Sequence, residues 1–454
     1  MLAVVFLLYL PTVRYGLVSD DNVQIVSNYR LTSWHYFPGY FTTHLWAHDA
    51  TIPGKWYRPL FLVWLRLCYV LLGSPTGSWH WGSLLAHVAA TAAVYALVRK
   101  LVGDSTSAVL SAGLFGIHPI HTESVAWISA VEDPLVTAFM ALCVYFYAAR
   151  KRPVSVLSLL FALLAMFTKE VGVMALGLIF AYEWIHSSLK KAVVASLPYL
   201  PCAAVYFALR MTAIGKATVA TRHYMHFWTM VLTWPHLLAT YALHLLWPIH
   251  LSVLYDDPLE TRIWPLLLLL VVLGALIWVF RKSGETIRFG MAWFAITLLP
   301  ALAIWYFDHD YLHDRYLYPP SVGLVVIAAV ILSRLRFTPV QVIATAAVAG
   351  ILCIVTLTGL PVWHDDISLH ERALELAPRD TRVMNNLALD YMAQLRYTEA
   401  SRLLQRAIAI KPTDPDLYTN LGSCYQLIGD YAEASRNKEI AVELAAKLNQ
   451  SGEQ

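Results

Sequence analysis

Two adjacent carboxylates, Asp20 and Asp21, follow directly on an apolar run near the start of the chain, in the stretch GLVSDDNVQIVSN (16–28). Neighbouring carboxylates repel each other and resist burial, so the pair is either part of a solvated loop or placed for chemistry. One carboxylate can take the proton of a hydroxyl nucleophile, while the second raises its basicity or holds a substrate group. The structural alternative is that the pair caps a short helix beginning at Asn22.

An arginine and a lysine stand where a phosphate could bind. Arg315, in HDRYLYPPSVG (313–323), has a planar fork that suits phosphate oxygens. The charge pattern described below places it on the membrane face that disfavours positive charge, which a merely snorkelling arginine does not explain. Tyr316 beside it is an interface anchor or a sugar contact. Lys169 and Glu170 divide two apolar runs, so they form a turn with an internal ion pair or, for Lys169, a contact to a donor phosphate.

A third cluster consists of His118, His121 and Glu123, with the spacing HxxHxE. This spacing could bind a divalent cation, since histidine is a common metal ligand. Pro119 interrupts the helix at this point, however, so hydrogen bonds to the backbone or a place in the wall of a substrate site are the alternatives. We therefore predict no metal site here.

The composition indicates which elements must position these residues. The chain has 454 residues, of which 58% are hydrophobic and 14% charged, and its mean hydropathy is +0.55. These values exclude an ordinary soluble domain and are typical of a polytopic membrane protein, so membrane lipid is the first expected partner and no nucleic acid is expected. The five cysteines are scattered without a CxxC pair, which predicts neither a disulfide framework nor a zinc site.

Eleven apolar segments are long enough to cross a membrane among neighbouring helices. They are 1–18, 79–98, 105–117, 134–149, 154–168, 171–186, 192–212, 263–280, 288–306, 318–333 and 339–360. Lys and Arg gather in every second connection, where 12 of the 23 that precede residue 361 lie, so these turns are expected to face the cytoplasm. The first loop (18–78), with the acidic pair, and the C-terminal part then share the opposite face. Two interrupted apolar stretches, 58–73 and 227–248, either lie at the interface or span, which would give thirteen helices.

The last part of the chain is soluble in character and repetitive. From residue 361 onward it holds 10 Lys/Arg and 14 Asp/Glu in 94 residues, and residues 381–447 repeat with a period of 34. The period pairs Leu387 with Leu421 and Ala400 with Ala434, which is the tetratricopeptide (TPR) pattern of paired antiparallel helices. We predict a membrane domain over 1–360 and a TPR domain over 361–449, made of a half-repeat (365–378) and repeats 381–412 and 415–447. Such a module docks a protein or caps an assembly.

Five stretches carry a resemblance to a known family. They are SDDNVQIVSN (19–28), GIHPIHTESVAWISAVEDPL (116–135), FTKEVGVMALGLIFAYEW (167–184), DRYLYPPSVG (314–323) and the TPR tail. In their order the chain resembles the transmembrane and TPR-containing O-mannosyltransferases and related bacterial proteins of the GT-C glycosyltransferase superfamily. The resemblance implies an all-α fold: a polytopic GT-C membrane domain of about 11 transmembrane helices followed by a short TPR α-solenoid. The count made from the charges agrees with this number.

For function, the resemblance implies transfer of a hexose, with mannose the first expectation, from a polyprenyl-phosphate donor to a Ser or Thr hydroxyl of a protein on the extracytoplasmic face. The transfer inverts the anomeric carbon. Asp21 is the expected base, with Asp20 the close alternative, and Arg315 and Lys169 are the expected ligands of the donor phosphate. The expected substrate contacts are His118, His121, Glu123, Asp133, Glu170 and Tyr316. The lipid-linked sugar is the only co-substrate that we expect, a divalent cation being the less favoured addition.

One motif departs from the family pattern. Where eukaryotic members show a glycine-arginine-alanine-aspartate run, this chain reads SAVEDPL (129–135), which keeps Asp133 and lacks the arginine, so donor or acceptor can differ. The alternative function is a non-enzymatic, membrane-anchored TPR scaffold for envelope protein assembly, with the acidic pair as a helix cap. The compact, loop-poor chain favours a bacterial inner membrane with the TPR module in the periplasm, or the endoplasmic reticulum with a luminal module in a eukaryote.

Overall fold

The computed structural model describes residues 1–451 except 50, 53, 74–75, 216–226, 250, 256–261, 304–311 and 336–337, with side chains to residue 447. Within these residues the chain is all-α, with short 3₁₀ turns and no strand, as predicted. It divides into two compact units, which are Met1–Leu251 with Pro258–Trp363 (unit 1) and Ser252–Asp257 with His364–Gln454 (unit 2). Residues 304–306 of the predicted span 288–306 and Arg336 of one predicted basic turn lie outside the described residues.

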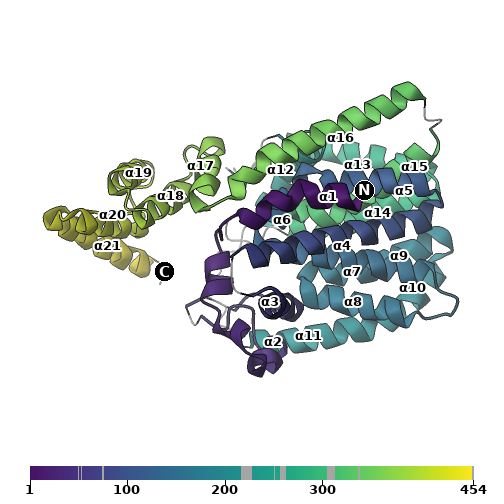
Figure 1. Cartoon of the computed structure of the whole chain (residues 1–454), viewed down its shortest axis with the longest axis horizontal. Coiled ribbons are helices and arrows are strands. Elements are labelled where there is room, and N and C mark those ends of the chain that lie inside the picture. The colour runs from purple at the N-terminus through teal and green to yellow at the C-terminus, as the bar shows by residue number, and fades with distance from the viewer. Residues whose placement is uncertain are drawn as a thin grey trace. The chain divides into compact units, whose positions relative to one another are not determined.

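Unit 1 is a bundle of helices (Figure 1). Its helices are α1 (Leu2–Tyr9), α2 (Phe37–Thr42), α3 (Pro59–Leu72), α4 (Thr76–Val102), α5 (Ser105–Ile117), α6 (Thr122–Ala126), α7 (Glu132–Ala148), α8 (Val156–Thr168), α9 (Met174–His186), α10 (Leu189–Ser196), α11 (Leu200–Ile214), α12 (Phe227–Leu246), α13 (Trp264–Lys282), α14 (Glu285–Leu298), α15 (Tyr318–Ser333) and α16 (Pro339–Gly359). In the described part of the chain, six helical stretches are long and apolar enough to cross a membrane, and four apolar helices are shorter. The number of eleven spans therefore stays a prediction.

The outer helices of unit 1 expose the apolar side chains that a bilayer covers. In the most apolar 18-residue window of each stretch, the buried share is 0% for Trp264–Lys282 and 6% for Pro339–Trp363. The same share is 83% for Ile128–Ala148. Long apolar faces of this kind are unstable in water, so α13 and α16 must face lipid or other membrane helices. The prediction of an integral membrane protein is confirmed by this arrangement.

The turns rich in Lys and Arg gather away from the first loop. Figure 1 shows the last turns of α9 and α15 at one end of unit 1, and α2 at the other. Arg99 and Lys100 end α4, and Arg281 and Lys282 end α13. This placement is what the charge pattern requires, while the identity of the aqueous compartment on each side stays a prediction.

Two glycines bring α14 and α15 into backbone contact. A Cβ on Gly290 would lie 2.7 Å from the carbonyl oxygen of Gly323, and a Cβ on Gly323 would overlap the carbonyl oxygen of Gly290. A side chain larger than hydrogen would clash at this crossing. The two glycines therefore let α14 and α15 approach more closely than helices with larger side chains at the crossing could. The indole of Trp293 on α14 adds a hydrogen bond from Nε1 to the carbonyl oxygen of Pro319 at 2.8 Å.

Unit 2 consists of consecutive helices that pair in antiparallel fashion. They are α17 (Asp366–Leu376), α18 (Thr381–Ala393), α19 (Tyr397–Ile410), α20 (Pro415–Ile428) and α21 (Tyr431–Ser451). The repeat positions Leu387, Leu421 and Ala400 are buried between the helices. Asp380 caps α18 by accepting a hydrogen bond from the backbone N–H of Arg382 at 2.8 Å. The predicted helical TPR tail is confirmed by these features.

Candidate active site

Two adjoining cavities lie in unit 1. The larger has a volume of about 480 Å³ and is walled mainly by apolar side chains, among them Met174, Tyr206, Phe207, Leu299, Pro300 and Ala301. The smaller has a volume of about 120 Å³ and is walled by polar and aromatic residues, among them Asp20, Gln24, Trp127, Ser129, Glu132 and Arg315. Both cavities are lined by Trp56, Arg58, Lys169 and Tyr316, so these residues form their common boundary.

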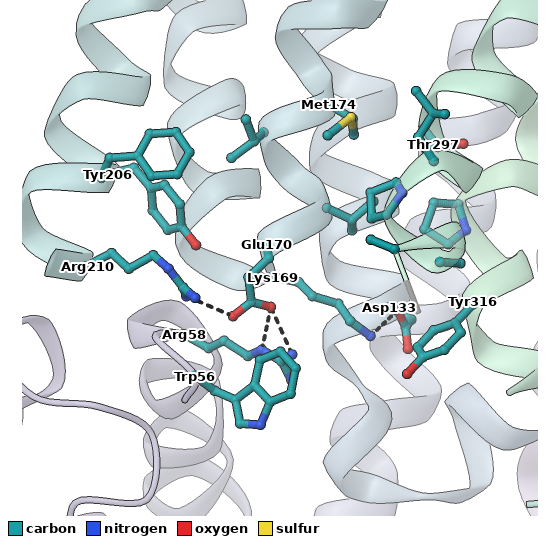
Figure 2. Close-up of a pocket in the computed structure, with 18 residues that line it drawn as sticks. Trp56, Arg58, Asp133, Lys169, Glu170, Met174, Tyr206, Arg210, Thr297 and Tyr316 are labelled. Carbon is teal, nitrogen blue, oxygen red and sulfur yellow. Dashed lines mark hydrogen bonds and ion pairs between the residues drawn. The ribbon is translucent and has the colours of Figure 1, made fainter. Parts of the chain in front are cut away.

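Arg58 stands at this boundary and joins two carboxylates. Its guanidinium pairs with Glu132 at 2.6 Å and with Glu170 at 2.8 Å, and it lies 4.6 Å from the ring centre of Trp56. Arg210 on α11 pairs with the other oxygen of Glu170 at 3.3 Å (Figure 2). Burial alone would raise the pKa of Glu170, but Arg58 and Arg210 hold it below its ordinary value. Glu170 therefore stays ionised and fixes both arginines.

Lys169 is the second boundary cation. Its ammonium pairs with Asp133 at 2.6 Å and with Glu132 at 3.1 Å, and its side chain is only 10% exposed. Figure 2 shows Lys169 pointing to Asp133, while Glu170 points the other way to Arg58. The internal Lys169–Glu170 pair that we considered is therefore not formed. The turn that separates the two side chains depends on Gly172, because a Cβ there would overlap the backbone of α8.

Arg315 lines the smaller cavity and is held by Glu123 of α6. Its Nη1 lies 2.6 Å from one carboxylate oxygen, and its backbone N–H donates to the other at 3.0 Å. The guanidinium also lies 4.7 Å from the ring centre of Trp127. Burial raises the pKa of Glu123 to about 7, although the charge of Arg315 opposes this shift. Glu123, which the sequence predicted as a substrate contact, thus does not line the smaller cavity itself but orients Arg315, which does.

Asp21 is completely buried and lines neither cavity, although it contacts Ser129, which lines the smaller one. Its Oδ1 accepts hydrogen bonds from the backbone N–H of Ser129 at 2.8 Å and from its hydroxyl at 2.6 Å, and its Oδ2 accepts one from the N–H of Val18 at 3.3 Å. Burial raises the pKa of Asp21 to about 7 despite these bonds. The helix that follows is a π-helix, Asn22–Val26, to which the Asp21 side chain gives no cap bond, so the capping alternative is wrong for this residue.

Asp20 lies in the wall of the smaller cavity and keeps contact with solvent. The backbone turns sharply before it, since Ser19 has φ +54°, a conformation that non-glycine residues rarely adopt. This turn sends two successive carboxylates in different directions. The pKa of Asp20 is raised above its ordinary value, mainly because the surrounding protein desolvates the carboxylate. The charge of Glu132 adds to this shift, and the charge of Arg315 opposes it. π-helical turns and strained backbone are frequent at functional sites.

The two predicted histidines lie behind the cavities rather than in their walls. His118 faces the carbonyl oxygen of Leu245 with Nε2 at 3.1 Å and accepts the N–H of Ile120 with Nδ1, which matches the backbone-bonded alternative. His121 is buried against Phe115 and Tyr318, and its ring nitrogens have no hydrogen-bond partner among the described residues. Among all the residues that the structure describes, no group of three His, Cys, Asp or Glu side chains is arranged to hold a metal ion.

Sequence reasoning missed Arg58, Arg210 and Ser129 and gave no role to Glu132. Arg58 carries the same signal that singled out Arg315, because it is a basic residue in a segment predicted to lie on the face that disfavours positive charge. Ser129 has no such signal, since its role depends on a contact 108 positions away along the chain.

The fold and the site together define a polytopic membrane protein with a charged cavity beside an apolar one, followed by a TPR module. Residues 57–215 match the family model of the dolichyl-phosphate-mannose-protein mannosyltransferases, and residues 388–429 match the TPR repeat. In sequence the chain resembles protein O-mannosyl-transferases.

A protein O-mannosyl-transferase of Caenorhabditis elegans is 24% identical over 406 residues, which is 84% of this chain and 57% of the worm protein. One of Drosophila melanogaster is 27% identical over 291 residues, which is 55% of this chain and 33% of the fly protein. This chain thus spans little more than half the length of the worm relative and a third of the fly relative. Among solved structures, that of ArnT from Cupriavidus metallidurans bound to undecaprenyl phosphate aligns with a TM-score of 0.42 at 17% identity, covering 98% of this chain and 77% of that one.

Proposed function

We propose that this chain is an inverting membrane glycosyltransferase that moves a sugar from polyprenyl phosphate to a Ser or Thr hydroxyl of a protein on the extracytoplasmic face. The observation that carries the proposal is the pair of cavities, one mainly apolar and one polar, with Arg58 and Lys169 at their common boundary. A lipid-linked sugar has the same three parts in the same order. The isoprenoid fits the larger cavity, the phosphate fits the cationic boundary, and the sugar fits the smaller cavity.

Asp20 is the proposed base. It takes the proton of the acceptor hydroxyl while that oxygen attacks the anomeric carbon, and the bond from the anomeric carbon to the phosphate oxygen breaks on the opposite side. The raised pKa of Asp20 suits this task, since a base works best when its pKa approaches the working pH. Asp21 is buried and lines neither cavity, and both of its carboxylate oxygens already accept hydrogen bonds, from Ser129 and Val18. We therefore assign it to support, which reverses the order expected from the sequence.

The departing phosphate requires fixed positive charge. Arg315 faces the smaller cavity with its guanidinium oriented by Glu123, and Lys169 faces it from the boundary. Both are held in place before a substrate binds, so they stabilise the developing negative charge without reorganisation. Trp56, which is half-buried in the cavity wall, supplies a flat apolar surface on which a sugar ring can stack.

The identity of the sugar and acceptor is proposed from the relatives. The relatives are named protein O-mannosyl-transferases, which supports mannose as the sugar and a protein as the acceptor. The TPR module supports recruitment of that protein, because paired helices of this kind commonly dock polypeptides. A bacterial inner membrane, with the module in the periplasm, remains our proposal for the compartment.

The test is sugar transfer by the purified full chain in nanodiscs, with radiolabelled mannosyl phosphoundecaprenol as donor and a Ser/Thr-rich peptide as acceptor. Asp20→Asn should lower the transfer rate by about 100- to 10,000-fold, the usual contribution of a general base, with donor binding retained. Asp104→Asn, which changes the cap of α5 outside the site, is the matched control. Retained transfer by Asp20→Asn with loss in Asp21→Asn would reverse the two roles. Absence of transfer by the natural sequence, with protein binding intact, would favour the scaffold alternative.

A further inference from the structure

Glu132 has one carboxylate oxygen in use and one without a partner. It is the first residue of α7, is 4% exposed, and forms part of the wall of the smaller cavity. Its Oε1 lies 2.6 Å from Nη1 of Arg58 and 3.1 Å from Nζ of Lys169. Its Oε2 is buried and has no hydrogen-bond partner among the described residues.

A buried carboxylate oxygen without a donor is costly and uncommon in folded proteins. The two nearest cations do not relieve it, because Arg58 also pairs with Glu170 and Lys169 also pairs with Asp133. These contacts do fix the carboxylate, since Arg58 is also tied to Glu170 and Lys169 lies in the turn after α8, next to Glu170. Glu132 therefore holds a fixed, unpaired acceptor in the wall of a cavity that is also lined by aromatic residues.

We propose that Oε2 of Glu132 accepts a hydrogen bond from a hydroxyl group of the donor sugar and so selects sugars that carry this hydroxyl. The inference rests on the proposed function, since it concerns the sugar of the same donor. A neutral hydroxyl fits better than a charged group. Together the three cations Arg58, Lys169 and Arg210 balance the three carboxylates that they contact, which are Glu132, Asp133 and Glu170. A carboxylate on the sugar would be repelled by Glu132.

Asp133 offers a comparison within the same helix. Its Oδ2 is also buried without a partner among the described residues, but the residue lines the larger, apolar cavity and not the smaller one. Asp133 should therefore affect the sugar much less than Glu132 does, although both pair with Lys169.

The experiment measures equilibrium binding of mannosyl phosphoundecaprenol and of its monodeoxy analogues to the full chain in nanodiscs, by quenching of tryptophan fluorescence. With the natural sequence, one analogue should bind about 10- to 100-fold more weakly than the parent, as expected for loss of a hydrogen bond to a charged group. In Glu132→Gln the parent should bind about tenfold more weakly, and the discrimination against that analogue should fall below about threefold. Asp133→Asn should keep the discrimination, and so should Glu183→Gln, which breaks an ion pair with Arg150 elsewhere in unit 1.

The outcomes separate this inference from the proposed function. Equal weakening of all donors in Glu132→Gln, with discrimination retained, would make Glu132 a purely structural residue and overturn the inference. Equal binding of every analogue by the natural sequence would overturn it as well. Selective binding without any sugar transfer would keep the inference and refute the proposed function. Glu132→Asp, which shortens the side chain but keeps its charge, should also lose the discrimination, so the result does not depend on one variant.

Discussion

Ser129→Ala is expected to destabilise the protein in a way that depends on pH. The change removes the hydroxyl that donates to Asp21 at 2.6 Å and leaves the backbone donors of Ser129 and Val18 in place. The pKa of Asp21 in the fold is about 7, above its value in an unfolded chain. The contribution of this group to stability is therefore full below about pH 4 and is lost as the pH rises through about 7.

The magnitude follows from the charge of the acceptor. Above pH 7 or so the hydroxyl donates to an ionised carboxylate, and such bonds contribute about 1.5–3 kcal/mol, whereas a bond between neutral groups contributes about 0.5–1.5 kcal/mol. At about pH 8.5 the variant should therefore lose about 1–2 kcal/mol more stability than at about pH 5, where Asp21 is protonated. The pKa of Asp21 should rise further in the variant, because its ionised form has lost a donor.

Thermal unfolding of the full chain in nanodiscs at the two pH values measures this difference. Ser129→Thr keeps the hydroxyl and should recover most of the loss. Ser187→Ala is the matched control, since that hydroxyl donates to Glu183 at an exposed position at 3.1 Å. An equal loss at both pH values, or no loss at either, would refute the argument that Ser129 stabilises a buried charge.

Three further predictions concern other parts of the molecule. Arg315→Lys cannot reproduce the planar contact with Glu123 and should weaken binding of undecaprenyl phosphate about tenfold, as measured by calorimetry. Gly172→Ala should cost about 1–3 kcal/mol and lower the melting temperature in thermal unfolding, because its Cβ would overlap the backbone of Ala165. Asp380→Ala should cost about 1 kcal/mol through loss of the cap of α18, so amide exchange at the start of that helix should speed up about fivefold in hydrogen-exchange mass spectrometry.

Each of these changes has a matched control. Arg99→Lys alters a basic residue at the end of α4 and should leave binding of undecaprenyl phosphate unchanged. Gly350→Ala should not lower the melting temperature, because a Cβ there meets nothing within 4 Å and alanine favours the interior of α16 over glycine. Unchanged exchange in the membrane helices would show that Asp380→Ala acts locally, and a general increase would contradict the capping argument.

The sequence was sufficient to predict the helical classes of both units. Hydropathy and the 34-residue period can both be read directly from the sequence. The hydropathy corresponds to the apolar membrane helices of unit 1, and the period corresponds to the paired helices of unit 2 with buried Leu387 and Leu421. The number of spans is a different kind of quantity. α5 and α8 are apolar but have only 13 residues each, and whether such helices cross depends on tilt and on their neighbours.

The candidate site was predictable only as a set of isolated charges. Asp20, Lys169 and Arg315 were found because a charge at the end of an apolar run is conspicuous, and all three line the smaller cavity. Their partners depend on tertiary packing, so the pairing of Lys169 with Asp133 and the clamp of Ser129 on Asp21 could not be read from spacing.

The division of roles within the acidic pair was beyond sequence reasoning for a more specific reason. It depends on the positive φ of Ser19, which is energetically unfavourable for a residue with a Cβ and is imposed by the surrounding structure. A glycine at this position would have signalled the turn.

The glycine crossing of α14 and α15 has a mechanical consequence for lipid traffic. Helices whose backbones touch cannot slide apart without opening a void, so Gly290 and Gly323 join the two into one rigid slab. That slab carries Thr297 and, just before α15, Tyr316, on one side of the apolar cavity. The long isoprenoid tail of the proposed donor would therefore enter on the facing side, where Arg210 of α11 contacts Glu170 and the carbonyl oxygen of Lys55. We expect the isoprenoid tail to enter the apolar cavity beside α11.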